Sequence, residues 1–318
     1  MKIVVTGALG HIGSYLIRYL AVQFPRSEIV IIDNLMTQRF SSLFNLPTIG
    51  HYRFIEGDVT QIDLHPILKD AHVLIHLAAI TDAAGSFNKA DLLEANNFQA
   101  TLNVAEACAE SGTRLIALSS TSVYGTQNEV VDEDCSQDEL KPQSPYALTK
   151  LKEEQLVSKL CLGGNLKAIS CRFGTIFGAS VGMRFHTAVN KFCWQAVMGQ
   201  PITVWSTAYD QKRPYLDLSD AASAISFIIR KDLFDGNIYN VLSHNATVGQ
   251  IVESIRDFIP DLQIKFVDNK IMNQLSYEVS CKRFESKGFV FNGDLKRGIG
   301  ETIGLLRRAY PNSSAAYT

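Results

Sequence analysis

The chain has 318 residues, a formal net charge of −2 and 46% hydrophobic residues. This length allows one large α/β core or two modest domains, and the balanced charge shows neither the basic excess of a nucleic-acid-binding protein nor an acidic tail. No apolar run reaches the roughly 20 residues that a membrane helix needs. The N-terminus has no signal-peptide pattern, and the six scattered cysteines form no C-x-x-C pair. We therefore expect a cytoplasmic protein with reduced thiols and no metal site.

Short apolar strands alternate with helical patterns in the first half of the chain. The sequence predicts strands at residues 2–6, 28–32, 52–55, 73–77, 114–119 and 168–172, and helices at 14–24, 92–110 and 147–160. Near-continuous apolar strands separated by helices are typical of a parallel sheet that is covered on both faces. We therefore expect a doubly wound Rossmann α/β fold, whose ligand lies beyond the carboxyl ends of the strands.

The rhythm loosens in the second half. The pattern predicts helices near residues 189–198, 220–229, 248–258 and 296–308, and strands at 202–205 and 237–241. We expect residues 1–178 to form the Rossmann domain, with 214–245 returning to it. Residues 179–213 and 246–310 are then a smaller C-terminal substrate-binding lobe, and 311–318 are a flexible tail.

Three glycines follow the first predicted strand, in VVTGALGHIGSYL. Gly7, Gly10 and Gly13 lie between a strand and a helix, which is the context that a dinucleotide fingerprint requires. The spacing G-x-x-G-x-x-G is one residue longer in its first gap than the standard motif. Gly7 allows the tight turn, Gly10 lets the backbone approach a pyrophosphate, and Gly13 lets the helix pack against the strand.

An acidic residue ends the second predicted strand, EIVIID. Asp33 is placed to bind the ribose hydroxyls of NAD and to repel the 2′-phosphate of NADP, although Arg39 lies six residues further on. The predicted cofactor is therefore NAD. Small or apolar residues after the next two strands complete the predicted cofactor contacts, which are Gly7, Gly10, His11, Ile12, Gly13, Asp33, Asn34, Asp58, Val59, Leu77, Ala78, Ala79, Tyr146 and Lys150.

A tyrosine and a lysine four residues apart follow the fifth strand, in PQSPYALTK. Tyr146 and Lys150 share one face of a helix, and an ammonium beside a phenol favours the phenolate, so we expect the pKa of Tyr146 to fall from about 10 toward neutral. Such a tyrosine can take a proton from an alcohol while a hydride leaves for NAD. A serine of LSST would then hydrogen-bond the same oxygen.

With these motifs the chain resembles an extended short-chain dehydrogenase/reductase of the NAD-dependent epimerase/dehydratase family. The resemblance rests on TGALGHIG, DNL, GDV, LAA, SSTSVYG, SPYALTK, CRFGTIFG and QKRPYLDLSD. It implies a Rossmann domain with a small C-terminal domain that binds a nucleoside-diphosphate sugar. It also implies that Ser120 is the catalytic hydroxyl, Tyr146 the base, and Lys150 its activator and a ligand of the nicotinamide ribose.

The resemblance also bears on the reaction. Family dehydratases tend to carry an acid two residues before the tyrosine of the VYG segment, and some carry one three residues before it. This chain has Ser122 and Thr121 there, and neither hydroxyl is a good general acid or base at pH 7. Dehydration and decarboxylation are therefore disfavoured, and epimerisation at C4 through a 4-keto intermediate is favoured. A ketosugar reductase with exchangeable NAD(P) and a non-catalytic dinucleotide sensor are the alternatives.

Substrate contacts follow from the resemblance and from position in the chain. The family pattern implies sugar or diphosphate contacts from Thr175, Asn190 and Arg213, and Thr81 follows the fourth strand; Ser120, Thr121 and Tyr146 complete the predicted set. For Arg184 and His186 two interpretations stay open: contact with an acidic or hydroxylated sugar, or solvated loop residues. Family members often dimerise through two helices, here 92–110 and 147–160, with an apolar surface from Leu92, Leu93, Ala95, Leu151, Leu156 and Val157.

Overall fold

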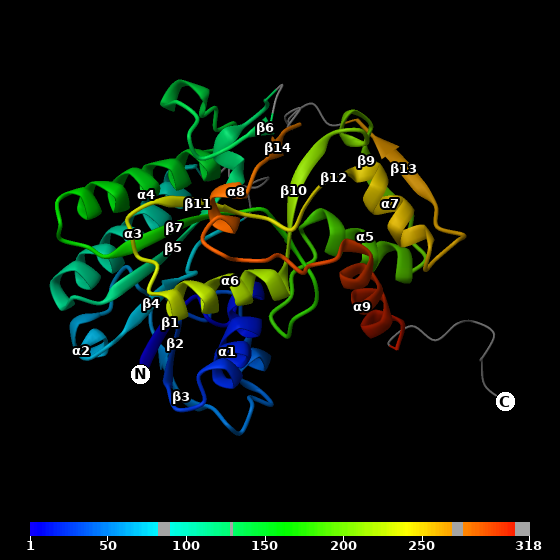
Figure 1. Cartoon of the computed structure of the whole chain (residues 1–318). Coiled ribbons are helices and arrows are strands. Elements are labelled where there is room, and N and C mark those ends of the chain that lie inside the picture. The colour runs from blue at the N-terminus through cyan, green and yellow to red at the C-terminus, as the bar shows by residue number, and fades with distance from the viewer. Residues whose placement is uncertain (82–89, 128–129, 269–275, 309–318) are drawn as a thin grey trace.

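The computed structural model describes residues 1–81, 90–127, 130–268 and 276–308 (Figure 1). Its centre is a seven-stranded sheet in the order β11-β7-β5-β4-β1-β2-β3, in which every pairing is parallel. The strands are β1 (Lys2–Thr6), β2 (Glu28–Asp33), β3 (His51–Glu56), β4 (Val73–His76), β5 (Arg114–Ser120), β7 (Ala168–Phe173) and β11 (Ile238–Val241). Each strand predicted for the first half is therefore present, and the doubly wound fold is confirmed.

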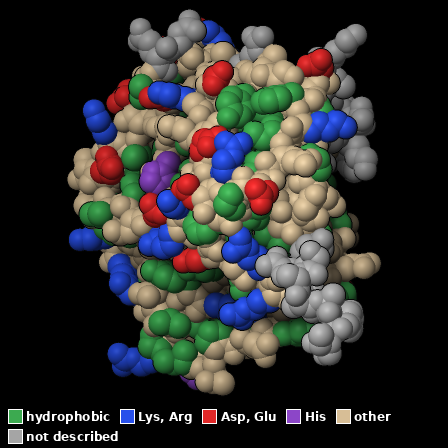
Figure 2. Space-filling model, turned by 90° about the vertical axis from the view of Figure 1, so that its right-hand side faces the viewer, with side chains coloured by type: hydrophobic (Ala, Val, Ile, Leu, Met, Phe, Trp, Pro, Cys, Tyr) green, Lys and Arg blue, Asp and Glu red, His purple; other side chains and the backbone are tan. Residues whose placement is uncertain are grey.

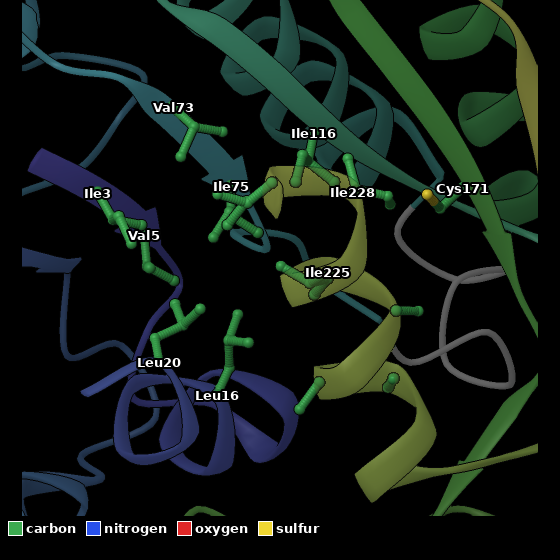
Figure 3. Packing of buried hydrophobic residues seen from close by; sticks show 14 of the residues in the cluster. Ile3, Val5, Leu16, Leu20, Val73, Ile75, Ile116, Cys171, Ile225 and Ile228 are labelled. Carbon is green, nitrogen blue, oxygen red and sulfur yellow. The ribbon is translucent and has the colours of Figure 1, made fainter. Parts of the chain in front are cut away.

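Helices cover both faces of this sheet. One face carries α1 (His11–Gln23) and α6 (Leu218–Lys231), and the other carries α2 (His65–Leu68), α3 (Ala90–Ser111) and α4 (Pro145–Leu162). Alternation along β1 shows why: Ile3 and Val5 pack in the cluster with α1 and α6, whereas Val4 packs in the cluster with α3 and α4. Figure 3 shows the first cluster, with Leu16 and Leu20 of α1 and Ile225 and Ile228 of α6 near the strand residues.

The second half forms its own apolar cluster beside the large sheet. Two small sheets belong to it, one with the order β12-β10-β8 and one pairing β13 with β9. The elements are β8 (Thr175–Phe177), α5 (Ala188–Val197), β9 (Ile202–Trp205), β10 (Lys212–Asp217), β12 (His244–Thr247), α7 (Val248–Arg256), β13 (Ile264–Val267) and α9 (Leu295–Arg307). Within segment 214–245, β11 is a strand of the large sheet and α6 packs against that sheet. β10 and β12 pair with each other in the three-stranded sheet.

The remaining helices, strands and turns are short. They are β6 (Val130–Val131), which pairs with β14 (Glu278–Val279), helix α8 (Lys282–Glu285), and the 3₁₀ turns η1 (Phe40–Leu43), η3 (Thr121–Tyr124), η4 (Gln137–Glu139) and η5 (Ser206–Ala208). The predicted tail, 311–318, lies outside the described residues. None of the helices in the described part of the chain is long and apolar enough to span a membrane.

Charged side chains are mixed on one face of the second half, and the burial of side chains on α3 and α4 corrects the expected dimer surface. On the face that contains α7 and α9, positive and negative side chains are interspersed (Figure 2). Leu93 and Val157, which we expected at a dimer surface, are 2% and 3% exposed within the single chain, and Val157 packs in the cluster with α2 and α3. That part of the prediction is wrong, because these side chains occupy the faces that α3 and α4 turn inward; the Leu92 side chain lies outside the description.

Candidate active site

A cavity of about 550 Å³ opens at the carboxyl ends of the central strands. Its walls come from the turns after β1, β2, β4 and β5, from the N-terminal part of α4, and from the second half of the chain. β1 and β4 are neighbours in the sheet although β2 and β3 separate them in sequence, so the cavity lies at the point where the strand order reverses. Every predicted cofactor, catalytic and substrate residue lines this cavity except Asn190.

The glycine turn after β1 has the geometry that its sequence predicts. Gly7 has a φ of +62°, and a Cβ there would lie 2.6 Å from the backbone nitrogen of Ala78. A Cβ on Gly13 would lie 2.6 Å from the backbone of Ala8, so α1 needs glycine to pack on the turn. Around a Cβ on Gly10, in contrast, the nearest group is the Gly7 carbonyl oxygen at 3.3 Å. Gly10 therefore presents bare backbone to the cavity.

Asp33 ends β2 at the side of the glycine turn. Its Oδ2 accepts a hydrogen bond from the Leu9 backbone N–H at 3.0 Å, and its Oδ1 accepts one from Leu35 N–H at 3.0 Å. The Asn34 amide donates to Asp58 Oδ2 at 3.1 Å, so two further predicted cofactor residues contact one another. A fixed carboxylate beside an exposed glycine backbone and a helix N-terminus fits the ribose and pyrophosphate of NAD.

The three predicted catalytic residues meet at the opposite part of the cavity. Ser120 ends β5, and its Oγ accepts hydrogen bonds from Ser122 N–H at 3.2 Å and from Ser122 Oγ at 2.9 Å. Tyr146 and Lys150 come from the first turns of α4, which Ser144 caps by accepting from Ala147 N–H. The Lys150 ammonium lies 5.9 Å from the centre of the Tyr146 ring and donates to the Leu118 carbonyl at 3.0 Å. One hydroxyl, one phenol and one ammonium thus line a common wall.

The pKa of Tyr146 differs from our expectation. Burial raises the pKa of this phenol, and its net direction is upward from the ordinary value of 10.0, although Lys150 and Arg184 lower it; Glu153 adds to the rise. The predicted fall is wrong because the spacing of Tyr146 and Lys150 reveals the neighbouring charge but neither the desolvation of the phenol nor the second charge.

A loop after β8 closes one side of the cavity against the glycine turn. His11 shares a hydrogen bond of 2.8 Å between its Nε2 and the Gly178 carbonyl, and burial lowers the pKa of His11 to about 4, so the ring is neutral and donates. Ser180 Oγ donates to the His11 carbonyl at 2.9 Å, and Gly182 N–H donates to Ser14 Oγ at 2.9 Å. Arg39 donates to the Gly182 carbonyl from the other side.

Basic residues from the second half line the cavity beyond this loop. Arg184 Nη1 donates to Thr81 Oγ1 at 2.6 Å, which joins the loop to the turn after β4. Arg213 on β10 and Thr175 on β8 also line the cavity. Thr121 Oγ1 donates to the Phe173 carbonyl at 3.3 Å and lies 3.5 Å from the Tyr277 hydroxyl.

Asn190 has another position than we predicted. It is fully buried and is absent from the cavity wall; its Oδ1 accepts from Gly178 N–H at 3.3 Å and its Nδ2 donates to the Arg184 carbonyl at 3.2 Å. A direct diphosphate contact is therefore not what this side chain makes here. Its amide instead hydrogen-bonds the backbone at both ends of the 178–184 loop, because α5 directs the side chain toward that loop.

Some lining residues were not predicted from the sequence. Lys191 and Trp205 line the cavity, and so does His76, whose Nδ1 lies 2.8 Å from Thr6 Oγ1. Lys191 and Trp205 come from α5 and the end of β9. No short motif marks them, since they reach the cavity through the packing of the second half. His76 is the last residue of β4, directly before the predicted contacts at Leu77 to Ala79, and that position was the available signal.

Comparison with known proteins agrees with this geometry. The family model described as "NAD dependent epimerase/dehydratase family" matches residues 3–241. The chain belongs to this family. Membership confirms the extended short-chain dehydrogenase/reductase resemblance, the Rossmann fold, and NAD as the family's cofactor.

Relatives of this family member carry several activities. The chain is 28% identical over 318 residues to an Arabidopsis thaliana protein named as a trifunctional UDP-glucose 4,6-dehydratase, UDP-4-keto-6-deoxy-D-glucose 3,5-epimerase and UDP-4-keto-L-rhamnose reductase. The match includes 95% of this chain but 46% of that relative, so the chain spans about half the length of the curated relative.

Two solved structures have the same architecture. One is MoeE5 in complex with UDP-glucuronic acid and NAD, with 26% identity, a TM-score of 0.84, and coverage of 97% of this chain and 100% of that one. The other is the UDP-N-acetylglucosamine 4-epimerase of Methanobrevibacter ruminantium M1 in complex with UDP-N-acetylmuramic acid, with 25% identity, a TM-score of 0.84, and coverage of 97% and 98%.

Proposed function

We propose that the protein epimerises a nucleoside-diphosphate sugar at C4, with NAD as its cofactor, through a transient 4-keto sugar. The observation that carries this proposal is that Ser120, Tyr146 and Lys150 line the same cavity as Asp33 and the glycine turn. Asp33 and the glycine turn would hold a dinucleotide in the cavity that Tyr146 also lines, so its hydride chemistry could be coupled to proton transfer. The 4-epimerase and UDP-sugar complexes among the structural neighbours support the choice of reaction and substrate class.

The protein's own residues supply orientation and proton transfer. When bound, NAD supplies the two-electron acceptor and donor, so that epimerisation consumes no cofactor. Ser120 Oγ would hydrogen-bond the C4 oxygen, and Tyr146 in its phenolate form would take the proton of the C4 hydroxyl and later return it. Burial of the phenol disfavours that form, and the charge of Lys150 favours it. Lys150 stabilises the phenolate by its charge. The keto sugar must then turn so that its opposite face meets the cofactor.

The acidic residues of the cavity favour epimerisation over dehydration. Among the described residues that line the cavity, Asp33 and Asp58 are the acidic ones, and both lie on the predicted dinucleotide side. Beside Ser120 the wall presents the hydroxyls of Thr121 and Ser122. Elimination of water needs a further proton shuttle, and hydroxyls serve poorly in that role. The dehydratase activity in the name of the Arabidopsis relative is therefore not assigned to this chain.

The basic residues of the cavity suit an anionic substrate. Arg184, His186, Lys191 and Arg213 line it, and guanidinium groups bind phosphate oxygens in a bidentate geometry. We assign Arg213 to the diphosphate. Arg184 lowers the pKa of Tyr146 and donates to Thr81, and these contacts support its assignment to the sugar. Both arginines lie in residues 179–213, which supports the proposal that this segment belongs to the substrate-binding lobe.

A nucleotide-ketosugar reductase that exchanges NAD(P) is the second candidate, because Arg39 lines the cavity near Asp33 and lowers the penalty for a 2′-phosphate. Denaturing the purified protein and identifying the released nucleotide by absorbance and mass separates the two. Stoichiometric NAD or NADH supports the closed redox cycle of an epimerase. An empty protein that prefers NADPH supports the reductase.

Turnover tests the proposal directly. The protein, loaded with NAD, is incubated with UDP-, GDP-, dTDP- and CDP-sugars, and the products are resolved by proton NMR for inversion at C4. We expect inversion of at least one sugar and a loss of more than about 100-fold in Tyr146→Phe, because general acid–base catalysis contributes about 10²–10⁴-fold. A 4-keto-6-deoxy product would indicate a dehydratase instead, and a reduced sugar would indicate a reductase.

We further propose a cytoplasmic homodimer, supported by the family resemblance and by the exposed Leu148 on α4. Light scattering after size-exclusion chromatography gives the mass; a monomer over the micromolar range would contradict the dimer.

A further inference from the structure

Lys150 lines the cavity and also pairs with a buried carboxylate, Glu153. Its Nζ donates to Glu153 Oε2 at 2.8 Å and to the Leu118 carbonyl at 3.0 Å. Both side chains of the ion pair are 6% exposed. An ammonium has three N–H groups, so these two contacts leave one N–H for the cavity. The carboxylate lies on α4 three residues after the lysine.

Glu153 differs in its pairing from its neighbour Glu154. Glu154 accepts hydrogen bonds from Arg172 Nε at 2.9 Å and Arg172 Nη2 at 2.7 Å, and it also accepts from Ser119. Arg172 therefore balances Glu154, whereas the cation beside Glu153 is Lys150. The other oxygen of Glu153, Oε1, is buried and accepts no hydrogen bond of normal geometry in the described part of the chain, although the Thr101 hydroxyl is near enough to favour the ionised form.

The titratable and charged groups around this pair come from α4, β4 and the loop after β8. Tyr146, Glu153 and Glu154 face Lys150 from α4, His76 faces it from β4, and Arg184 faces Tyr146 from the loop after β8. Burial, helped by Lys150, lowers the pKa of His76 to about 3, so this ring is neutral. Burial alone would lower the pKa of Lys150, but Glu153 and Tyr146 raise it overall. The catalytic wall therefore carries a cation that a carboxylate largely balances.

We propose that Glu153 is a positioning residue of the active site, which anchors the Lys150 ammonium against α4 and partly cancels its charge toward the Tyr146 phenol. The proposal rests on the assignment of Tyr146 as the proton-transfer group. A buried carboxylate paired with Lys150 keeps the lysine protonated and limits how far its charge stabilises the Tyr146 phenolate. The same carboxylate opposes phenolate directly, since like charges in a buried site repel.

Removal of this carboxylate shifts the titration of one tyrosine. In Glu153→Gln the amide oxygen still accepts from Lys150, but the negative charge is gone. We expect the Tyr146 midpoint to fall by about one to two pH units, which is the size of a single charge acting over about 6–12 Å at an effective dielectric near 20. Tyrosinate absorbance at 295 nm is followed against pH, and the curve of the same protein carrying Tyr146→Phe is subtracted to isolate Tyr146.

Matched variants separate charge from structure. Glu94→Gln removes a carboxylate that joins α3 to Lys152 of α4; it is 45% exposed and screened by solvent, so the Tyr146 midpoint should stay unchanged. Glu153→Asp keeps the charge and should restore most of the wild-type midpoint. If Glu153→Gln does not melt cooperatively, Glu153→Ala reports the same direction. A midpoint in the Gln or Ala variant that stays at or above the wild-type value would overturn the proposal. The titration needs neither substrate nor turnover, so its outcome is independent of whether C4 epimerisation is the reaction.

Discussion

The carboxylate of Asp33 is tied to the glycine turn by a hydrogen bond from the Leu9 backbone N–H, with 3.0 Å between Leu9 N and Asp33 Oδ2. This bond joins the end of β2 to the turn between β1 and α1, so the acid and the exposed backbone of Gly10 form one rigid surface. The second oxygen accepts from Leu35 N–H at 3.0 Å. The charge of Asp33 is thus fixed where a ribose would lie, and Arg39 is close enough for Asp33 to affect its pKa.

Cofactor preference should depend on this one charge. In Asp33→Asn we expect NAD to bind about tenfold more weakly and NADP to gain, because the repulsion of a 2′-phosphate disappears while Arg39 remains. Isothermal titration with both dinucleotides gives the ratio of dissociation constants. Asp63→Asn, which alters a residue that accepts from His65 N–H at the start of α2, is the control. An unchanged ratio in Asp33→Asn would remove Asp33 from cofactor selection.

Alanine substitutions at two glycines of the same turn should affect different properties, stability at Gly13 and NAD affinity at Gly10. A Cβ on Gly13 would overlap Ala8 backbone atoms at 2.6 Å, so Gly13→Ala should lower the free energy of unfolding by about 1–3 kcal/mol. A Cβ on Gly10 would lie 3.3 Å from the Gly7 carbonyl oxygen, a tight contact but a far milder one than at Gly13. Gly10→Ala should therefore lose less stability than Gly13→Ala but lose NAD affinity by about tenfold or more, because the methyl group occupies the approach of the pyrophosphate. Urea unfolding and dinucleotide titration measure the two effects. Equal losses of stability in both variants would contradict this division.

The guanidinium of Arg184 should act on the sugar and leave the dinucleotide unaffected. We expect Arg184→Gln to weaken sugar-nucleotide binding by about 10- to 100-fold, the usual cost of a charge-assisted hydrogen bond, with NAD affinity within twofold of wild type. Arg256→Gln, on the surface of α7 beside Glu253, is the matched control. Binding of a panel of UDP-sugars and of UDP alone locates the loss. A loss that is the same for UDP and for UDP-sugars would move Arg184 to the diphosphate.

Local patterns carried most of the prediction of fold and cofactor site. β1, β2, β4 and β5 are nearly continuous apolar runs bounded by polar residues, and this pattern predicts them without help from distant contacts. The glycine spacing and Asp33 are also local, because each residue lies at the end of a strand that the pattern already places. Residue order along the chain therefore brings Gly7, Asp33 and Ala78 to one edge of the sheet.

The substrate side depends on contacts that no local pattern contains. β10 and β12 pair across a separation that includes the whole of α6, and Arg213 reaches the cavity through that pairing. Asn190 lies on a predicted helix, yet the rotation of α5 turns its amide toward Gly178 rather than into the cavity. The same holds for the pKa of Tyr146, since the spacing from Lys150 is local whereas the desolvation of the phenol comes from the assembled cavity.

Buried histidines should make the fold sensitive to acid. Burial lowers the pKa of His11 to about 4 and that of His76 to about 3, from an ordinary value of 6.5. Both are depressed in the folded state, so the stability they contribute is complete above pH 6.5 and is lost as the pH falls toward 4, by about 1.4 kcal/mol per pH unit for each ring. Between pH 7 and pH 5 we expect His76→Asn to lose about 2 kcal/mol less free energy of unfolding than wild type, because the unfolded chain then takes up one proton fewer. Urea unfolding at both pH values gives this difference, with the exposed His51→Asn as the control. An equal loss in wild type and His76→Asn would mean that His76 is already charged, or exposed, in the folded protein.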